Sequence, residues 1–285
     1  MGRGGATTFA ADLVNSDAIL IMGSNMAECH PVAFRWVIQA KTRREHPCTV
    51  MHADPRFTRT SAMANVYAPL RAGSDIVFLG ALIRHVLDEH ERIQQKPAQQ
   101  RTPRERFFHD YLTRYTNAAA IINEEFIDAE DAEGVFSGYD AAARRYDNRT
   151  WRYETDAPAR TPVADAPGSP SFAELVRQLA GPPAHQDPTL RHERCVFQIL
   201  RRHYQRYTPE LVEQVCGTPR ETFSKVADAL LTNSGPDKTS AICYAVGWTQ
   251  HTVGVQMIRA AAILQLLLGN IGRPGGGILA LRGHA

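Results

Sequence analysis

Four short apolar runs, each followed by a polar loop, constrain the fold of this 285-residue chain more than any other feature. They lie at residues 17–22, 48–52, 65–70 and 238–246. Apolar runs of this length without polar alternation are typical of buried parallel strands. Amphipathic segments follow them, beginning at Pro31 and after Gly73, and an apolar one runs to about Leu268. Strand, loop and helix in repetition predict an α/β fold with a parallel sheet.

The composition changes between the third run and the fourth. Residues 92–104 are polar, 105–150 are aromatic and mixed, and 155–188 hold seven of the 17 prolines. We expect 155–188 to be a surface excursion with one short helix at 171–180, followed by helices at 192–206, 209–215 and 219–232. The predicted organisation is a three-layer, Rossmann-like parallel sheet with a largely helical insertion. Its parts are 1–91, the insertion 92–235 and the returning part 236–285, with both outer parts in one sheet.

Composition excludes several classes of protein. The formal net charge is +2, which argues against a nucleic-acid binder. No apolar run approaches the ~20 residues of a membrane helix, so we expect no direct membrane insertion. The first residues lack the apolar core of a signal peptide. The hydrophobic content of 44% is enough for a sizeable core.

Cysteine and histidine spacing predicts no metal site. The five cysteines stand at 29, 48, 195, 216 and 243, so no CxxC pair exists, and we interpret them as buried or free thiols. His30, His52 and His251 are scattered, and each alone favours a structural role. The sequence contains no phosphate-binding P-loop, HExxH or zinc pattern.

Three loops should converge on one crevice, because the carboxyl ends of parallel strands meet at one edge of a sheet. These loops are 23–30, 54–60 and 71–75. In the first, GSNMAECHP, backbone N–H groups suit a diphosphate, and Asn25 and Glu28 suit ribose or base edges. The alternative is an ordinary strand-to-helix turn. Taken by itself, the sequence of this loop favours that alternative.

The next two loops carry the same ambiguity. Asp54 ends a strand, where a carboxylate can accept from a ribose or a base, and Arg56 and Arg59 with Thr58 suit phosphate oxygens. The alternative is a capped helix with a solvated basic face. Gly73 and Asp75 open a helix whose N-terminus attracts anions, although a simple helix cap is the favoured interpretation for Asp75.

Two further motifs lie near the C-terminus. Residues 247–251, GWTQH, gather indole, hydroxyl, amide and imidazole groups in one predicted loop, and such loops often carry function. The alternative is a cap by Thr249 with a buried Trp248. Arg282, before Gly283 and His284, can bind a carboxylate in a bidentate manner, although alone it is merely a charged C-terminus.

In order along the chain, these motifs resemble the catalytic (alpha) subunits of respiratory formate dehydrogenases. The segments that carry the resemblance include MGSNMAECHP, DPRFTRTSAMANVYAPLRAGSDI, RYTPELVEQVCGTP, YAVGWTQHTVGVQMIRAAAILQLLLGNIGRPGGGI and LRGH. The pair GWTQH and LRGH is quite specific to that group. The formate dehydrogenases belong to the molybdopterin oxidoreductases, which include dimethyl sulfoxide reductase.

The resemblance implies a molybdenum or tungsten ion held by two molybdopterin guanine dinucleotides. Formate is oxidised to carbon dioxide, and two electrons leave through a [4Fe-4S] cluster. Matching positions imply that Arg282 is the catalytic arginine that orients formate. They also imply a set of cofactor-binding residues: Asn25, Glu28, Asp54, Arg56, Thr58, Gly73, Asp75, Gly247, Gln250 and His284.

The departures from the family pattern predict an internal part of a larger subunit. The [4Fe-4S] cysteines, the selenocysteine or cysteine metal ligand and the later domains are all missing from this sequence. We therefore expect the chain alone to be inactive. A selenocysteine codon upstream, UGA, would be read as a stop, and a reading frame that restarts after it would explain the start at Met1. Expected partners are the rest of the subunit, an iron–sulfur beta subunit and a membrane cytochrome b subunit. The full subunit would be periplasmic, and the chain as written cytoplasmic.

Two other hypotheses stay open from the sequence. One is a nucleotide- or pterin-binding module without redox chemistry, such as an assembly partner, in which Arg282 has no role. The other is a different molybdopterin oxidoreductase, such as a relative of the nitrate or polysulfide reductases, against which GWTQH and LRGH argue.

Overall fold

A computed structural model describes residues 5–156 and 183–281. The chain forms two compact units: the first contains Met1–Tyr115 and Tyr204–Ala285, and the second contains Thr116–His203. The units change over at other positions than 91 and 235, and the predicted domain boundaries stay a prediction. Within the described residues, no helix is both long and apolar enough to cross a membrane.

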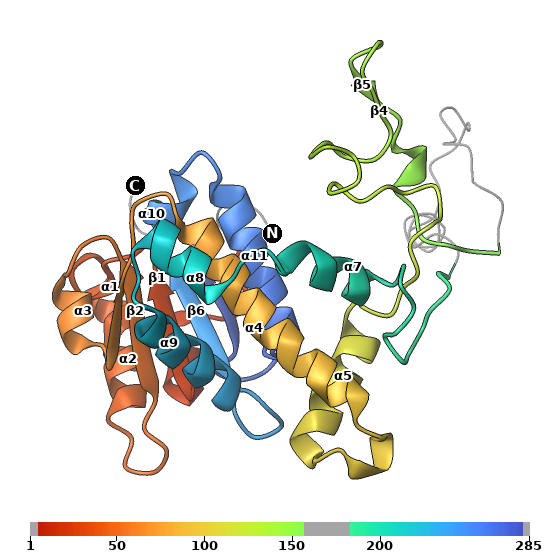
Figure 1. Cartoon of the computed structure of the whole chain (residues 1–285). Coiled ribbons are helices and arrows are strands. Elements are labelled where there is room, and N and C mark those ends of the chain that lie inside the picture. The colour runs from red at the N-terminus through yellow and green to blue at the C-terminus, as the bar shows by residue number, and fades with distance from the viewer. Residues whose placement is uncertain (1–4, 157–182, 282–285) are drawn as a thin grey trace, which may run out of the picture. The chain divides into compact units, whose positions relative to one another are not determined.

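The first unit is built on a parallel sheet of five strands, which confirms the predicted α/β fold. The order is β3-β2-β1-β6-β7, and β1, β2 and β6 are labelled in Figure 1. Ala18 of β1 pairs with Thr49 of β2 on one side and with Ser240 of β6 on the other, so both ends of the chain share the sheet as predicted. The strands are β1 Ala18–Met22, β2 Thr49–Asp54, β3 Val66–Pro69, β6 Ser240–Tyr244 and β7 Gly277–Ala280.

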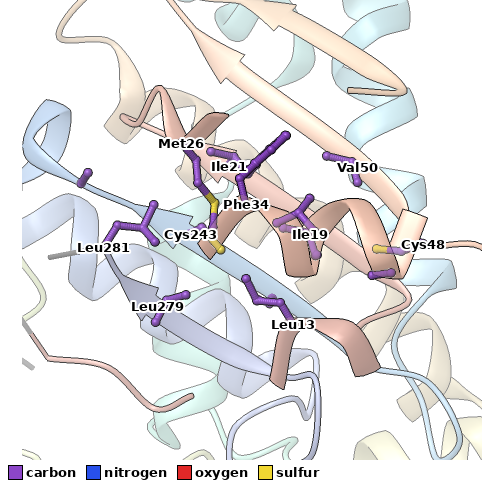
Figure 2. Packing of buried hydrophobic residues seen from close by; sticks show 14 residues of the cluster. Leu13, Ile19, Ile21, Met26, Phe34, Cys48, Val50, Cys243, Leu279 and Leu281 are labelled. Carbon is purple, nitrogen blue, oxygen red and sulfur yellow. The ribbon is translucent and has the colours of Figure 1, made fainter. Parts of the chain in front are cut away.

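Helices cover both faces of the sheet, which makes three layers. On one face lie η1 Ala10–Asn15 and α2 Pro31–Lys41, and on the other lie α4 Asp75–Gln95, α9 Arg220–Thr232 and α11 Gly254–Leu267. Figure 2 shows the first of these interfaces, where Ile19 and Ile21 of β1 meet Leu13 and Phe34. Every residue of β1 is buried, because the strand is covered on both faces.

The buried side of α2 is formed by Phe34, Val37 and Ala40, which pack into the core. Val32, although apolar, is 75% exposed. Positions 34, 37 and 40 follow each other at a spacing of three, so they form one stripe along the helix. Val32 lies on the opposite side of that stripe.

Two of the predicted helices differ in extent from their predicted ranges. The helix expected at 209–215 is a single turn, α8 Pro209–Leu211, continued by the π-helical η4 Val212–Cys216. The helix expected from Pro219 begins at Arg220, with Pro219 as its N-cap residue, and the Thr218 hydroxyl donates to the carbonyl of Pro69 at 2.5 Å. The remaining elements described in the first unit are the helix α5 Pro103–Tyr115 and the short turns α1 Met26–Cys29, α3 Arg59–Met63, η2 Ala98–Gln100 and α10 Val246–Thr249.

In residues 116–156 and 183–203, the described part of the second unit, regular elements are short. Isolated antiparallel bridges join Ala120 to Gln186, Ile121 to Cys195 and Ile122 to Tyr153. The helix expected at 192–206 is α7 Val196–Tyr204, while the one expected at 171–180 lies outside the described residues. The other elements are a hairpin of β4 Tyr139–Asp140 and β5 Arg145–Tyr146, and the turn η3 Asn148–Thr150.

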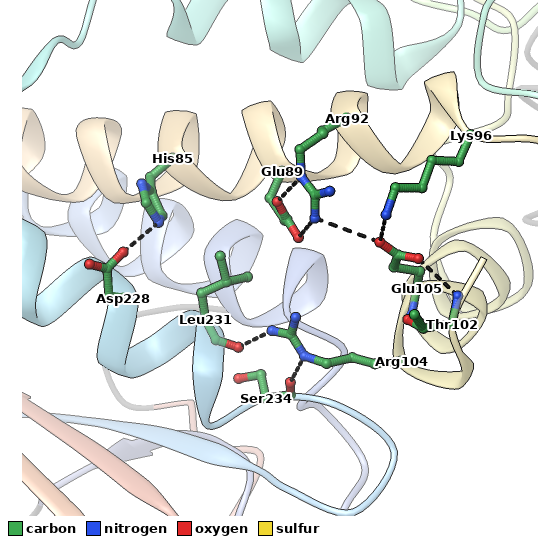
Figure 3. A network of polar contacts seen from close by, with 10 residues as sticks. All are labelled: His85, Glu89, Arg92, Lys96, Thr102, Arg104, Glu105, Asp228, Leu231 and Ser234. Atoms are coloured by element: carbon green, nitrogen blue, oxygen red, sulfur yellow. Dashed lines mark hydrogen bonds and ion pairs between the residues drawn. The ribbon is translucent and has the colours of Figure 1, made fainter. Parts of the chain in front are cut away.

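A polar network joins α4, α5 and the end of α9 (Figure 3). The Glu105 carboxylate accepts from Lys96 Nζ at 2.5 Å and from the Thr102 N–H at 2.8 Å. These bonds, that of Lys96 foremost, hold the pKa of Glu105 at about 2. Arg104 donates to the carbonyls of Ser234 and Leu231, and so ties α5 to the segment after α9. The network fixes the long helix α4, whose N-terminus reaches the site described below.

We expect Glu105→Gln to lower the free energy of unfolding at neutral pH by about 1–3 kcal/mol, because hydrogen bonds to a charged group are lost. The pKa of Glu105 lies below its ordinary value of 4.5 in the folded state. Its contribution is therefore present above that value and lost as the pH falls toward about 2. Urea unfolding at neutral and acidic pH should show the difference from wild type shrinking on acidification.

The matched control for this prediction is Glu221→Gln. The Glu221 side chain is 82% exposed and pairs with Lys225 across one helical turn, so its loss should leave the unfolding midpoint unchanged. A difference between wild type and Glu105→Gln that grows on acidification would contradict the role given to the carboxylate.

Candidate functional site

The strand order fixes where a ligand site belongs. From β1 the chain moves outward through β2 to β3, whereas β6 and β7 continue on the other side of β1. The loops that leave β1 and β6 therefore diverge at a switch point, where open α/β sheets bind their ligands. A cavity of about 400 Å³ opens there, and it is lined by Gly23, Ser24, Asn25, Cys29, His30, Asp54, Pro55, Arg56, Thr58, Ala72, Gly73, Asp75, Ala245, Val246, Gly247 and His251.

The three loops expected to converge do meet in this cavity, together with the segment after β6. Of the predicted cofactor-binding residues, the cavity brings together Asn25, Asp54, Arg56, Thr58, Gly73, Asp75 and Gly247. Glu28 and Gln250 lie in the same loops but do not line it. Arg282 and His284 lie outside the described residues.

Sequence reasoning missed several residues of the cavity wall, among them Ser24, Cys29 and His251. Their signal was their position in the predicted loops, since each stands within a few residues of one that was named. His251 taken alone favoured a structural role over a metal ligand, although its imidazole belongs to the GWTQH loop for which a function was considered. Its place beside Gly73 depends on folding, which brings its Nε2 to 3.2 Å from where a Cβ on Gly73 would be.

Two glycines allow the loops after β1 and β6 to touch. Gly23 has a φ of 65°, and a Cβ there would lie 2.7 Å from Cδ1 of Trp248. A Cβ on Gly247 would lie 2.7 Å from the Cα of Gly23. The Gly247 N–H donates to the Gly23 carbonyl at 3.1 Å. Larger residues would push the two backbones apart, so the shape of the cavity floor depends on both glycines.

Trp248 lies fully buried beneath this contact and joins it to α4. Its indole Nε1–H donates to Asp75 Oδ1 at 2.9 Å, and its ring stacks on Tyr244 with centroids 5.2 Å apart. Residues 246–249 form the helical turn α10 where a loop was expected, because the buried indole anchors the segment. Thr249 ends this turn and does not cap the following helix.

Asp75 is not the simple cap that its position suggested. Ser74 is the N-cap residue of α4, and the Asp75 carboxylate is turned to Trp248 and is 8% exposed. Burial raises the pKa of Asp75, and the indole hydrogen bond opposes that rise. The carboxylate thus links the start of α4 to α10 while it also lines the cavity.

The β1 loop is held by its own polar groups. Asn25 Oδ1 accepts from the Thr60 hydroxyl at 2.9 Å, and the Ala27 N–H donates to that hydroxyl at 2.9 Å. The Asn25 amide also donates to the Glu28 carboxylate, and this bond is the largest cause that lowers the pKa of Glu28. Arg59 lies 3.6 Å from the same carboxylate. Asn25 and Glu28 thus bind each other within the loop, and their contacts with Thr60 and Arg59 attach the loop to α3.

Asp54 shapes the loop after β2. Its Oδ1 accepts from the Arg56 N–H at 2.9 Å, which closes an Asx turn, and its carbonyl accepts from the Tyr67 hydroxyl at 3.0 Å. The turn places the exposed Arg56 at the cavity wall. The cavity therefore offers carboxylates, hydroxyls, backbone N–H groups and a guanidinium. In residues 5–156 and 183–281, no group of three histidine, cysteine or acidic residues is arranged to hold a metal ion.

Comparison with known proteins decides the family. The molybdopterin oxidoreductase family profile matches residues 4–284. The chain belongs to the molybdopterin oxidoreductase family.

Relatives within the family are much longer than this chain. The formate dehydrogenase subunit alpha of Megalodesulfovibrio gigas is 45% identical over 284 residues, which are 100% of this chain and 24% of that protein. The nitrate-inducible formate dehydrogenase major subunit of Escherichia coli is 42% identical with the same coverage. Acetylene hydratase from Pelobacter acetylenicus aligns with a TM-score of 0.49 at 15% identity, over 95% of this chain and 25% of that one. This molybdopterin oxidoreductase chain spans about a quarter of the length of the formate dehydrogenase subunits it matches.

We expect Trp248→Phe to lower the free energy of unfolding by about 1–3 kcal/mol, because it leaves the buried Asp75 carboxylate without its indole donor. The pKa of Asp75, already raised by burial, should rise further in this variant. The deficit relative to wild type should therefore be larger at neutral than at acidic pH, where the carboxyl is protonated in both proteins. Urea unfolding at several pH values measures it.

Trp36→Phe is the control for this experiment. Trp36 is half-buried on α2, and the Arg35 guanidinium lies over its ring. Its replacement should change stability without the pH dependence. If both tryptophan variants show the same pH profile, the Asp75–Trp248 bond does not have the role assigned to it.

Proposed function

We propose that this chain is part of the catalytic subunit of a molybdopterin-dependent formate dehydrogenase. In that proposal the cavity holds one guanine dinucleotide of the cofactor. The observation that carries it is the convergence of loops 23–30, 54–60 and 71–75 with Gly247 in one cavity at the switch point. The identity of 45% and 42% to formate dehydrogenase subunits supports the choice of reaction.

The residues of the cavity fit a nucleotide. Its volume of about 400 Å³ lies in the ordinary range of ligand sites. Arg56 brings a positive charge to the cavity wall, which suits the diphosphate of a nucleotide. Asp54 and Asp75 supply carboxylate acceptors for a ribose hydroxyl or a base amino group. The hydroxyl of Ser24 is buried and has no hydrogen-bond partner in the described part of the chain.

When bound, the molybdenum or tungsten ion of the cofactor supplies the two-electron chemistry that converts formate to carbon dioxide. The chain's own contribution, in this proposal, is to bind the dinucleotide and to orient the substrate. Arg282 would hold the formate carboxylate through paired N–H bonds, which suit a planar anion. A [4Fe-4S] cluster, an iron–sulfur beta subunit and a membrane cytochrome b subunit complete the proposed electron path.

We expect the purified 285-residue chain to show no formate oxidation, because it spans 24% of its formate dehydrogenase relatives.

In the full-length enzyme, Arg282→Ala should abolish most formate turnover, whereas Arg273→Ala should leave KM for formate unchanged. Arg273 donates to backbone carbonyls in the described unit, so it tests for general damage. Undiminished turnover in Arg282→Ala would favour the binding-module hypothesis.

Cys29 offers a direct test of the cavity. It is exposed and lines the cavity, whereas the other four cysteines are buried. We expect guanosine diphosphate to bind and to slow alkylation of Cys29 by iodoacetamide, as followed by intact mass and peptide mapping. Cys29→Ser should remove the fast-labelling site.

Inorganic phosphate serves as the control ligand, because it lacks the base and ribose and should protect Cys29 much less. Equal labelling rates with and without saturating guanosine diphosphate, together with no heat of binding in calorimetry, would contradict a nucleotide site in this cavity.

A further inference from the structure

His52 is an interior imidazole that joins the loop after β1 to α3. It stands on β2 and is 0% exposed. Its Nε2 lies 3.1 Å from the carbonyl oxygen of Ser24, and its Nδ1 lies 2.8 Å from Oγ of Ser61. Both ring nitrogens are therefore engaged, one on each side of the strand end.

The direction of each hydrogen bond follows from the groups involved. The Ser24 carbonyl can only accept, so Nε2 carries the proton and Nδ1 accepts from the Ser61 hydroxyl. Ser61 Oγ in turn accepts from the Thr58 N–H at 2.9 Å. Burial lowers the pKa of His52, although Asp54, whose Oδ2 lies 3.7 Å from Nε2, opposes the shift. A neutral imidazole fits this arrangement.

Ser24 is the residue of this chain of hydrogen bonds that lines the cavity. The residue is 5% exposed and lines the cavity, and its Oγ is buried without a hydrogen-bond partner within residues 5–156 and 183–281. A buried hydroxyl without a partner is rare, because its desolvation is not compensated. His52 fixes the backbone of Ser24, while the hydroxyl hydrogen stays free to rotate toward a ligand.

We propose that Ser24 Oγ donates a hydrogen bond to an anionic oxygen of the ligand in the cavity, and that His52 is the positioning residue that holds Ser24 in place. This inference rests on the proposed nucleotide site. The ligand group is a phosphate, because the cavity that Ser24 lines also carries the Arg56 guanidinium, which suits an anionic oxygen.

Ser24→Ala tests the donor. In calorimetry with guanosine diphosphate we expect the affinity to fall about tenfold, as for the loss of one hydrogen bond to a charged group. The unfolding midpoint should stay the same or rise, because the variant removes an unpaired buried hydroxyl. The control is Thr113→Val on α5, whose hydroxyl donates to the His109 carbonyl of its own helix. It should leave the affinity unchanged.

Two substitutions of His52 separate its two bonds. Gln places its amide nitrogen near the Nε2 position, so His52→Gln keeps the bond to Ser24 and loses that to Ser61. Asn is shorter and reaches only toward Ser61, so His52→Asn loses the bond to Ser24. We expect His52→Gln to bind guanosine diphosphate within about threefold of wild type and His52→Asn to be about tenfold weaker. In a Ser24→Ala background, His52→Asn should cause no further loss.

Each outcome decides a separate point. If the wild-type chain does not bind guanosine diphosphate, both the proposed nucleotide site and this inference fail. If wild type binds and Ser24→Ala binds as tightly, the inference fails while the proposed function stands. If the losses from Ser24→Ala and His52→Asn add fully, Ser24 keeps its role and His52 is not its positioning residue.

Discussion

The contact between Gly23 and the turn of Gly247 and Trp248 is the constraint on which the rest of the site depends. It brings together the loops that leave β1 and β6, the two central strands between which the chain reverses its direction across the sheet. Neither backbone could approach so closely with a side chain in between. The cavity exists because the two loops meet at their base and diverge above it.

Polar side chains around the cavity fall into two groups. One group forms its hydrogen bonds within the protein: Asn25 binds Thr60 and Glu28, and His52 binds Ser24 and Ser61. The other group keeps capacity for a ligand, as the Ser24 hydroxyl does. The first group holds the second in place, so a substitution in either group can weaken ligand binding. Only a substitution in the first group should lower the free energy of unfolding.

Belonging to the molybdopterin oxidoreductases gives the cavity a chemical context, while the chain spans about a quarter of its formate dehydrogenase relatives. In the described residues the cavity offers groups for a nucleotide and none of the three-residue clusters that hold a metal ion. The groups that line the cavity are those that the proposed nucleotide site requires.

The sequence by itself determined the parallel α/β fold, since apolar runs such as 17–22 reveal buried strands locally. It also determined that loops 23–30, 54–60 and 71–75 share one edge, because parallel strands must align their carboxyl ends. Tertiary structure alone decided the partner of Asp75, which is a tryptophan 173 positions away, and the buried side of α2. It also decided that 246–249 is helical and that 277–280, which follows two glycines, is a strand. These features depend on contacts between distant segments, which no local pattern of residues encodes.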